Sequence, residues 1–216
     1  MKSSTDNQKF RPDGGEFLKR SFDILLSGFG LIASSPLWAL ISAAIVIEDG
    51  LPVFFRQSRW GKDGSNFPAL KFRSMVADAE RGVGPLQATE GDARITRVGG
   101  VLRATALDEL PQLWNILRGD MSFVGPRALR PAEIEMEGGV SVPLEQVPGF
   151  VERSAVPPGL TGIAQIYAPR DITRRQKFRF DRLYIRRQSF MLDLRLIMLS
   201  FWITFRGTWE ARGRKF

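Results

Sequence analysis

The pattern of hydrophobic and polar positions divides the chain into a polar start, one long apolar run and a mixed remainder. Residues 1–15 are mostly polar, which predicts a flexible tail. From residue 24 to residue 47 the chain carries no charge. As a straight helix this run would reach roughly 36 Å, compared with about 30 Å for the hydrocarbon core of a bilayer. Residues 16–48 are therefore predicted to form a membrane helix.

Two features of the apolar run favour a helix that enters and leaves the membrane by the same face. Ser34-Ser35-Pro36 lies in its middle, and a proline inside a helix removes a backbone hydrogen bond and bends the helix. Neighbouring serine hydroxyls can bind the freed carbonyls. Basic residues on both flanks also keep both ends in the cytoplasm by the positive-inside rule; they are Lys19, Arg20, Arg56, Arg59 and Lys62. The sequence favours a re-entrant helix-break-helix with its break at Ser35 and Pro36, and a spanning helix with a proline kink stays open.

The mixed remainder predicts an α+β fold that is mostly helical, with its catalytic domain at residues 49–189. Apolar residues 53–55 and 67–70 flank a Gly-Lys-Asp-Gly turn, which predicts a small β-hairpin. The residues after the hairpin indicate helices near 74–81 and 107–118, and a glycine ends the second one.

The C-terminal half contains a loosely patterned segment and, at its end, a segment whose first part is mostly apolar. Glycine and proline cluster over residues 138–162, which indicates an irregular surface segment. Residues 190–216 are predicted to form an amphipathic segment in the membrane interface, since their uninterrupted apolar part is too short to span a bilayer. Trp202 and Trp209 are the expected interfacial anchors. A buried core helix is the alternative for this segment.

The amino-acid composition excludes several kinds of catalytic and metal-binding site. The chain of 216 residues has no His and no Cys, which excludes a Ser-His-Asp triad, a thiolate nucleophile and an imidazole metal site. Carboxylates, Lys, Arg, Tyr and hydroxyls are the groups that remain. A metal ion would be held by oxygen ligands, and Mg²⁺ is then the expected ion.

The net charge of +8 is unevenly distributed. Residues 170–216 hold 13 Lys and Arg against four acids, whereas residues 1–169 are close to neutral. This asymmetry indicates an anionic partner, which can be nucleic acid, an acidic membrane surface or a phosphorylated substrate.

The segment with the strongest catalytic signal contains Asp108 and Glu109, followed by Pro111. Acids at the start of a helix commonly serve only as caps and dipole partners. Here an arginine, Arg103, precedes the pair, and the glycine-rich turns of residues 119–127 follow closely. Carboxylates, arginines and glycine turns are the parts that hold phosphate and Mg²⁺.

Motifs distributed over about residues 17–206 closely resemble the bacterial sugar transferase family, the monotopic phosphoglycosyl transferases. The motifs are Lys19-Arg20-Ser21-Phe22-Asp23, Ser35-Pro36, Arg56-Gln57-Ser58-Arg59-Trp60-Gly61, Lys71-Phe72-Arg73-Ser74-Met75, Asp92-Ala93-Arg94-Ile95-Thr96-Arg97-Val98-Gly99, Leu107-Asp108-Glu109-Leu110-Pro111-Gln112-Leu113-Trp114-Asn115, Gly119-Asp120-Met121-Ser122-Phe123-Val124-Gly125-Pro126-Arg127 and Pro158-Gly159-Leu160-Thr161-Gly162-Ile163-Ala164-Gln165. So many motifs in one order make a chance match very unlikely.

The resemblance implies transfer of a sugar 1-phosphate from a UDP-sugar to polyprenyl (undecaprenyl) phosphate, with UMP as the second product. The enzyme would act at the cytoplasmic face of the bacterial inner membrane, in the first membrane step of a glycoconjugate pathway. The family's Asp-Glu pair falls on Asp108 and Glu109, so Asp108 would be the nucleophile, with Mg²⁺ at the diphosphate and Asp108 as its protein ligand. An ionised carboxylate needs no general base, which suits a chain without His.

Anionic substrates also need cations, and the candidates for phosphate binding are Lys71, Arg73, Arg103, Arg127 and Arg170. The resemblance supports the re-entrant form of the membrane helix. Ala128 stands where the family usually has proline after Gly-Pro-Arg, and the residues before Arg170 also differ, which obscures the sugar preference.

Two rival classes remain open from the sequence. One is a basic, membrane-anchored protein that binds nucleic acid or anionic lipid without catalysis, and the other is an inactive membrane scaffold. The Asp-Glu pair and the glycine turns would have no purpose in the first. The partners expected here are a UDP-sugar, polyprenyl phosphate and the bilayer, with no nucleic acid, and a homo-oligomer is allowed.

Overall fold

The computed structural model describes residues 15–79, 92–131, 133–137, 140–169 and 171–206. The fold is mostly helical with a small β-hairpin, as predicted, and it also contains two further two-stranded sheets. The tail predicted at residues 1–15 lies almost wholly outside the described residues, and so does the end of the predicted C-terminal segment, including Trp209.

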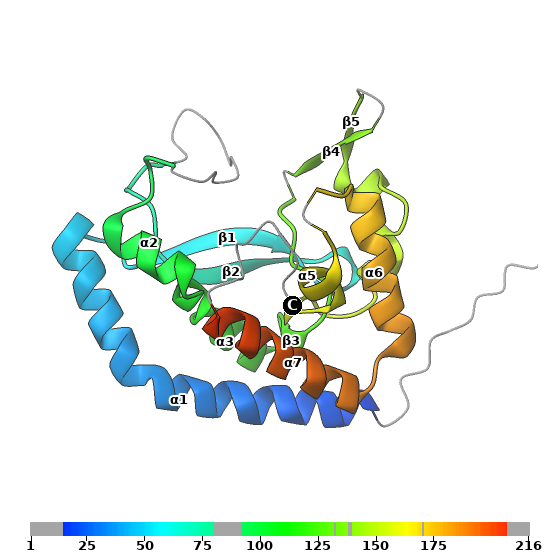
Figure 1. Cartoon of the computed structure of the whole chain (residues 1–216), viewed down its shortest axis with the longest axis horizontal. Coiled ribbons are helices and arrows are strands. Elements are labelled where there is room, and N and C mark those ends of the chain that lie inside the picture. The colour runs from blue at the N-terminus through cyan, green and yellow to red at the C-terminus, as the bar shows by residue number, and fades with distance from the viewer. Residues whose placement is uncertain (1–14, 80–91, 132, 138–139, 170, 207–216) are drawn as a thin grey trace, which may run out of the picture.

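The apolar run lies within a single helix, α1 (Gly15–Asp49), whose side chains are exposed or half-buried apart from those of Asp23, Ser27, Ile41 and Ile45. Among the described residues, α1 is the one helix long and apolar enough to cross a membrane. Figure 1 shows that α1 changes direction between its dark-blue and its light-blue parts. Pro36 lies inside the helix, and the Ser35 hydroxyl donates to the Ile32 carbonyl at 2.8 Å. That carbonyl is the one whose helical partner would be the missing N–H of Pro36, so the serine replaces the lost hydrogen bond.

The predicted β-hairpin is confirmed. Strands β1 (Phe54–Trp60) and β2 (Asn66–Phe72) pair antiparallel, and the short 3-10 turn η1 (Lys62–Gly64) joins them. Phe54 and Phe72 stack on each other and pack against Trp38 of α1. The base of the hairpin is thereby anchored on the C-terminal half of α1.

The segment at 107–118 folds into two short pieces. The 3-10 turn η2 (Leu107–Glu109) is followed by α3 (Gln112–Arg118), which ends at Gly119 as predicted, with a left-handed φ of 98°. Helix α2 (Arg97–Ala104) precedes them. The Arg20 guanidinium of α1 donates to the carbonyls of Ile116 and Leu117, which tightens the end of α3 against α1.

The helix expected near residues 74–81 is wrong for the residues that the structure describes. Met75 forms an extended bridge with Ile95, and a turn follows at 77–79. A Cβ on Gly99 of α2 would lie 2.0 Å from the Ser74 carbonyl oxygen, so the two backbones are in direct contact. This tertiary contact holds the segment extended and overrides its local helical preference.

The irregular surface segment expected at 138–162 is also partly wrong. It contains strand β5 (Val140–Pro143), which pairs with β4 (Ile134–Glu137), the 3-10 turn η3 (Leu144–Gln146), helix α4 (Phe150–Arg153) and strand β6 (Gly159–Thr161). Strand β6 pairs in parallel with the buried strand β3 (Ser122–Val124). A Cβ on Gly159 would lie 2.0 Å from the Gly125 nitrogen, so glycine here permits close backbone packing rather than a loose loop.

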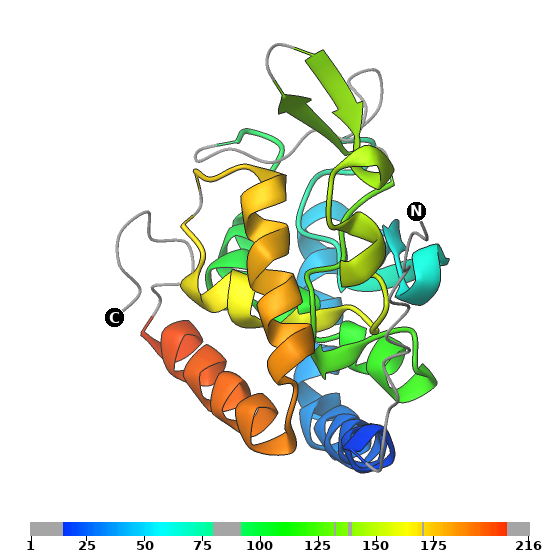
Figure 2. The same ribbon diagram turned by 90° about the vertical axis from the view of Figure 1, so that its right-hand side faces the viewer.

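The last helices pack around this sheet. Helix α5 (Ile163–Tyr167) leads into α6 (Arg174–Arg187) and α7 (Phe190–Phe205). In Figures 1 and 2, α7 lies beside the N-terminal part of α1, whereas α6 stands upright with only its C-terminal end near them. One side of α7 enters the core, and its other side exposes large apolar residues, which are Met191, Met198, Phe201, Trp202 and Phe205. The interfacial position of this helix stays a prediction.

A buried polar network joins α1, α6 and α7. Asp193 accepts from Lys19 Nζ at 2.7 Å and from the Tyr184 hydroxyl at 2.8 Å. Both donors also reach the Val124 carbonyl at the end of β3, at 3.0 and 3.1 Å. The charge of Asp193 therefore faces the protein interior, and it does not interrupt the exposed apolar side of α7.

Candidate active site

Asp108 and Glu109 lie in η2, immediately beside α1. The turn begins after Ala106, which adopts a left-handed φ of 57°, and Pro111 then caps α3. Helix α3, which follows, contacts α1, since a Cβ on Gly30 would lie 3.1 Å from a methyl group of Leu113. The acid pair is flanked by Leu107 and Leu110, which pack against the cluster that contains Ile41 and Ile45 of α1.

Lys71 on strand β2 contacts both carboxylates. Its Nζ lies 2.5 Å from Glu109 Oε1 and 3.6 Å from Asp108 Oδ2. Asp108 is only 7% exposed. The structure therefore brings together three of the residues that the sequence singled out, from two segments more than 30 positions apart.

The two carboxyl groups have different electrostatic environments. Burial raises the pKa of Asp108 above its ordinary value, against the opposing charges of Lys71 and Arg103, and the neighbouring Glu109 charge raises it further. Burial also acts to raise the pKa of Glu109, but Lys71 and two arginines outweigh it and lower that pKa to about 2. Asp108 is therefore the more basic carboxylate of the pair, and Glu109 is the one neutralised by its ion pair.

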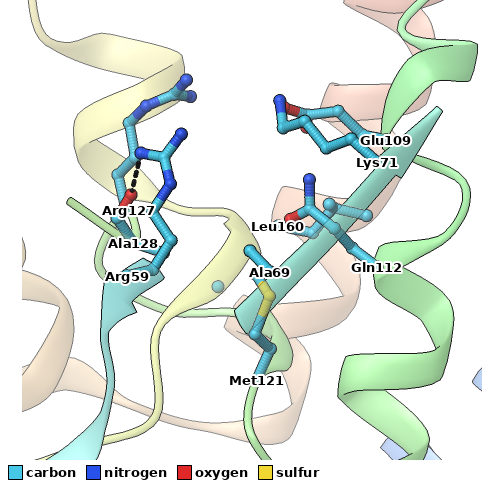
Figure 3. A pocket seen from close by; sticks show the side chains of 10 residues that line it. Arg59, Ala69, Lys71, Glu109, Gln112, Met121, Arg127, Ala128 and Leu160 are labelled. Carbon is cyan, nitrogen blue, oxygen red and sulfur yellow. Dashed lines mark hydrogen bonds and ion pairs between the residues drawn. The ribbon is translucent and has the colours of Figure 1, made fainter. Parts of the chain in front are cut away.

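A cleft opens beside this pair, and two arginines form its opposite wall (Figure 3). Arg127 follows β3, and Arg59 lies near the end of β1. Arg59 is buried, and its Nη1 donates to the Ala128 carbonyl at 2.9 Å. Burial, with repulsion from Arg127, lowers the pKa of Arg59 to about 10, so it stays cationic near neutral pH. Two guanidinium groups side by side in a cleft favour an anionic ligand between them and Lys71.

The other predicted phosphate ligands lie elsewhere or act from a distance. Arg73 sits at the end of α1, where its Nη2 donates to the carbonyls of Asp49 and Gly50 at 2.8 and 2.6 Å. It holds the C-terminal end of α1 and does not line the cleft. Arg103, in the last turn of α2, acts on Asp108 through its charge. Arg170 lies outside the described residues.

The lining residues that sequence reasoning did not select for the site include Arg59, Gln112 and Met121. Each of these three residues lies in one of the family motifs, but a motif does not show which way a side chain points in the fold. Arg59 and Lys71 lie on antiparallel strands, and only the register of β1 with β2 places both on the cleft. That register was the missing information.

The residues present fit a Mg²⁺ ion only with help from a substrate. Among the described residues no group of three or more acids could hold a metal ion. Asp108 and Glu109 are two adjacent carboxylates beside a cationic cleft. Mg²⁺ is commonly bound by one or two carboxylates together with substrate phosphates and water. The donor set therefore suits an ion that arrives with a diphosphate.

Comparison with known proteins places most of the chain within one family. The sequence profile of the bacterial sugar transferase family matches residues 14–207. The exopolysaccharide production protein PSS of Rhizobium leguminosarum bv. phaseoli is 40% identical over 185 residues, which cover 83% of this chain and 91% of that protein. The exopolysaccharide production protein ExoY of Rhizobium meliloti (strain 1021) is 38% identical over 201 residues, or 87% of this chain and 84% of that protein.

A longer relative carries a name that states a reaction. It is the UDP-glucose:undecaprenyl-phosphate glucose-1-phosphate transferase of Klebsiella pneumoniae, 41% identical over 187 residues. The match covers 84% of this chain but only 39% of that protein. A protein with the same name in Escherichia coli (strain K12) is 40% identical over 189 residues, again 39% of its length.

Proposed function

Because the chain belongs to the bacterial sugar transferase family, we propose that it transfers a sugar 1-phosphate from a UDP-sugar to undecaprenyl phosphate, which yields undecaprenyl-diphospho-sugar and UMP. The observation that carries this proposal is the cleft where Glu109 faces cations from two other segments, with its buried neighbour Asp108 held 3.6 Å from Lys71 Nζ. The names of the longer relatives make UDP-glucose the first donor to test.

The first step is attack by a carboxylate oxygen of Asp108 on the β-phosphorus of the UDP-sugar. A new P–O bond forms to Asp108, the bond from the β-phosphorus to the bridging oxygen breaks, and UMP leaves with that oxygen. In the second step an oxygen of undecaprenyl phosphate attacks the same phosphorus and releases Asp108. No proton needs to move in either step if the carboxylate and the acceptor phosphate are ionised, which suits a site without His.

The electrostatic difference between the acids supports this division of roles. Asp108 has the raised pKa and the greater basicity, which favour it as the nucleophile. Glu109 has a strongly lowered pKa and holds Lys71, so it is suited to orient that cation rather than to attack. Lys71, Arg59 and Arg127 would neutralise the diphosphate and its leaving group.

Asp108 is the residue proposed to hold Mg²⁺, with the diphosphate as the other ligand. When bound, the ion would offset the negative charge of the phosphoryl oxygens. The chain's own contribution is to keep Asp108 buried and aligned, through η2 and the contact of α3 with α1.

The position of the cleft also suits a lipid acceptor. The turn with Asp108 adjoins α1, whose exposed side chains are mostly apolar. We propose that α1 dips into the cytoplasmic leaflet of the inner membrane and returns, with α7 in the interface beside it. The phosphate of an embedded polyprenol would then reach the cleft without leaving the membrane surface.

The test is UMP release from UDP-sugars by purified protein in lipid nanodiscs, with and without undecaprenyl phosphate. We expect release that depends on a UDP-sugar and stops with EDTA, and excess Mg²⁺ should restore it. The covalent step predicts that radiolabel from the sugar of the donor stays with the protein when acceptor is absent. Absence of UMP release across a panel of UDP-sugars would refute the function, and activity resistant to EDTA would refute the metal.

A further inference from the structure

A buried ion pair lies behind the arginine wall of the cleft. Arg153 of α4 donates from Nε to Asp181 Oδ2 of α6 at 2.8 Å, and the two side chains are only 4% and 5% exposed. The Arg153 guanidinium also lies over the Phe178 ring, 4.7 Å from its centroid. Burying such a pair costs desolvation energy, and replacing a buried ion pair by apolar residues is often neutral or stabilising. The pair is therefore weak evidence for a role in stability alone.

The remaining hydrogen bond of Arg153 points toward the cleft. Its Nη2 donates to the backbone carbonyl of Arg127 at 2.6 Å. The next two carbonyls of this segment are also bound, since Ala128 accepts from Arg59 Nη1 at 2.9 Å and Leu129 accepts from the Trp60 nitrogen at 2.8 Å. Three successive carbonyls are therefore held from outside the segment.

The C-terminal end of α4 is also bound to the β-hairpin. The Asp63 nitrogen in the hairpin turn donates to the Ser154 carbonyl, directly after α4, at 2.7 Å. The β-hairpin and α4 thus both bind the segment 127–129, and they also bind each other. The segment has little backbone freedom left, and Arg127 extends from it into the cleft (Figure 3).

We propose that Arg153, held by Asp181, is a positioning residue that aims Arg127 at the diphosphate of the donor. It acts through the Arg127 carbonyl and does not touch the substrate. This inference rests on the proposed function, because it assigns Arg127 to the donor phosphates. The guanidinium donates to Asp181 through Nε and to the carbonyl through Nη2, two nitrogens fixed in one plane, whereas an ammonium would have to reach both acceptors from a single nitrogen on a flexible stem.

The test is a double-mutant comparison on UMP release with saturating undecaprenyl phosphate. Arg153→Met combined with Asp181→Leu removes the pair without leaving a buried charge. We expect kcat/KM for the UDP-sugar to fall at least about tenfold, mainly through KM, while the melting temperature stays near that of the wild type. In an Arg127→Ala background the same pair of changes should have little further effect, because the side chain that it positions is already gone.

The matched control is Arg182→Gln. Arg182 also joins α6 to α4, through Glu152 at 3.9 Å, but within the described part of the chain it does not bind the segment 127–129, and it lies outside the cleft. This variant should keep the wild-type kcat/KM. If the paired variant fails to fold, Arg153→Lys replaces it, and we expect the same rise in KM with a smaller amplitude.

Two results would overturn the inference. One is an unchanged KM in the paired variant while Arg127→Ala is impaired. The other is an effect of equal size with and without Arg127, which would show that Arg153 supports the fold in general. Both results differ from failure of the proposed function, in which the wild-type protein itself releases no UMP.

Discussion

The apolar layer of α1 and α7 and the cationic cleft above it are built in opposite ways. The layer consists of two continuous helices whose exposed side chains are mostly apolar. The cleft collects single residues from β1, β2, η2 and the segment after β3. A local pattern suffices to make the layer, whereas the cleft exists only after the hairpin, α3 and α4 have packed. Substitutions near the cleft should therefore affect catalysis, whereas substitutions in the layer should affect membrane topology and membrane binding.

The largest effect is expected in the cleft. Asp108→Asn should lower turnover at least about a thousandfold, because an amide cannot accept the phosphoryl group. The amide has nearly the shape of the carboxylate, so the fold should persist. Glu109→Gln is the adjacent control and should be severely impaired but retain more activity. UMP release and circular dichroism measure both, and near-normal turnover in Asp108→Asn would remove it as the nucleophile.

The next effect concerns the layer and changes topology rather than chemistry. Replacing Ser35 and Pro36 by Leu and Ala should straighten α1 and move the N-terminus across the membrane, since the bend and its replacement hydrogen bond are lost. Single cysteines introduced at Ser4 and Ser65 report this, because the native chain has none.

The expected result is that an impermeant thiol reagent on the periplasmic side labels position 4 in the Leu-Ala variant but not with the native pair. Position 65 should stay protected in both. Periplasmic labelling at position 4 with Ser35 and Pro36 intact would contradict the re-entrant form.

A smaller effect, on the pH dependence of kcat/KM, distinguishes Asp108 from Glu109. Arg103 lowers the pKa of Asp108, so Arg103→Gln should raise that pKa. If Asp108 is the nucleophile as proposed, its protonated form cannot attack, and the acid limb of kcat/KM should therefore move to higher pH. Glu109, with a pKa of about 2, stays ionised over this range and does not contribute to the limb. Arg97→Gln, at the other end of α2, is the control. A limb that moves equally in both variants would contradict the assignment.

The smallest predicted effect tests which part of α6 contacts the membrane beside the layer of α1 and α7. Helix α6 stands upright, so only its C-terminal end approaches α1 and α7. Arg186→Gln and Arg187→Gln should weaken binding to vesicles with anionic lipid, each by about 1 kcal/mol or roughly fivefold in affinity. Changes at Arg175 and Arg179, in the part of α6 farther from that layer, should have little effect. Equal losses at both ends would mean that α6 lies along the membrane.

The errors of sequence reasoning share one cause. Residues near 74–81 have helical preference, but contact between Ser74 and Gly99 holds the chain extended. The glycines of 138–162 indicate a loose segment, yet Gly159 allows close packing against Gly125. Local propensity cannot include a partner that lies 25 or more positions away.

What the sequence by itself determined is everything that depends on local order: the long apolar helix with its proline, the hairpin, the turn that ends α3, and the acid pair with its family resemblance. Only the tertiary structure decided which cations serve that pair. It placed Lys71 against Glu109, added Arg59, and used Arg73 to clamp α1 instead. The physical reason is that an ion pair or a bound carbonyl is set by the direction of a side chain in the packed fold. Strand register and helix contacts fix that direction, and neither is encoded within a single motif.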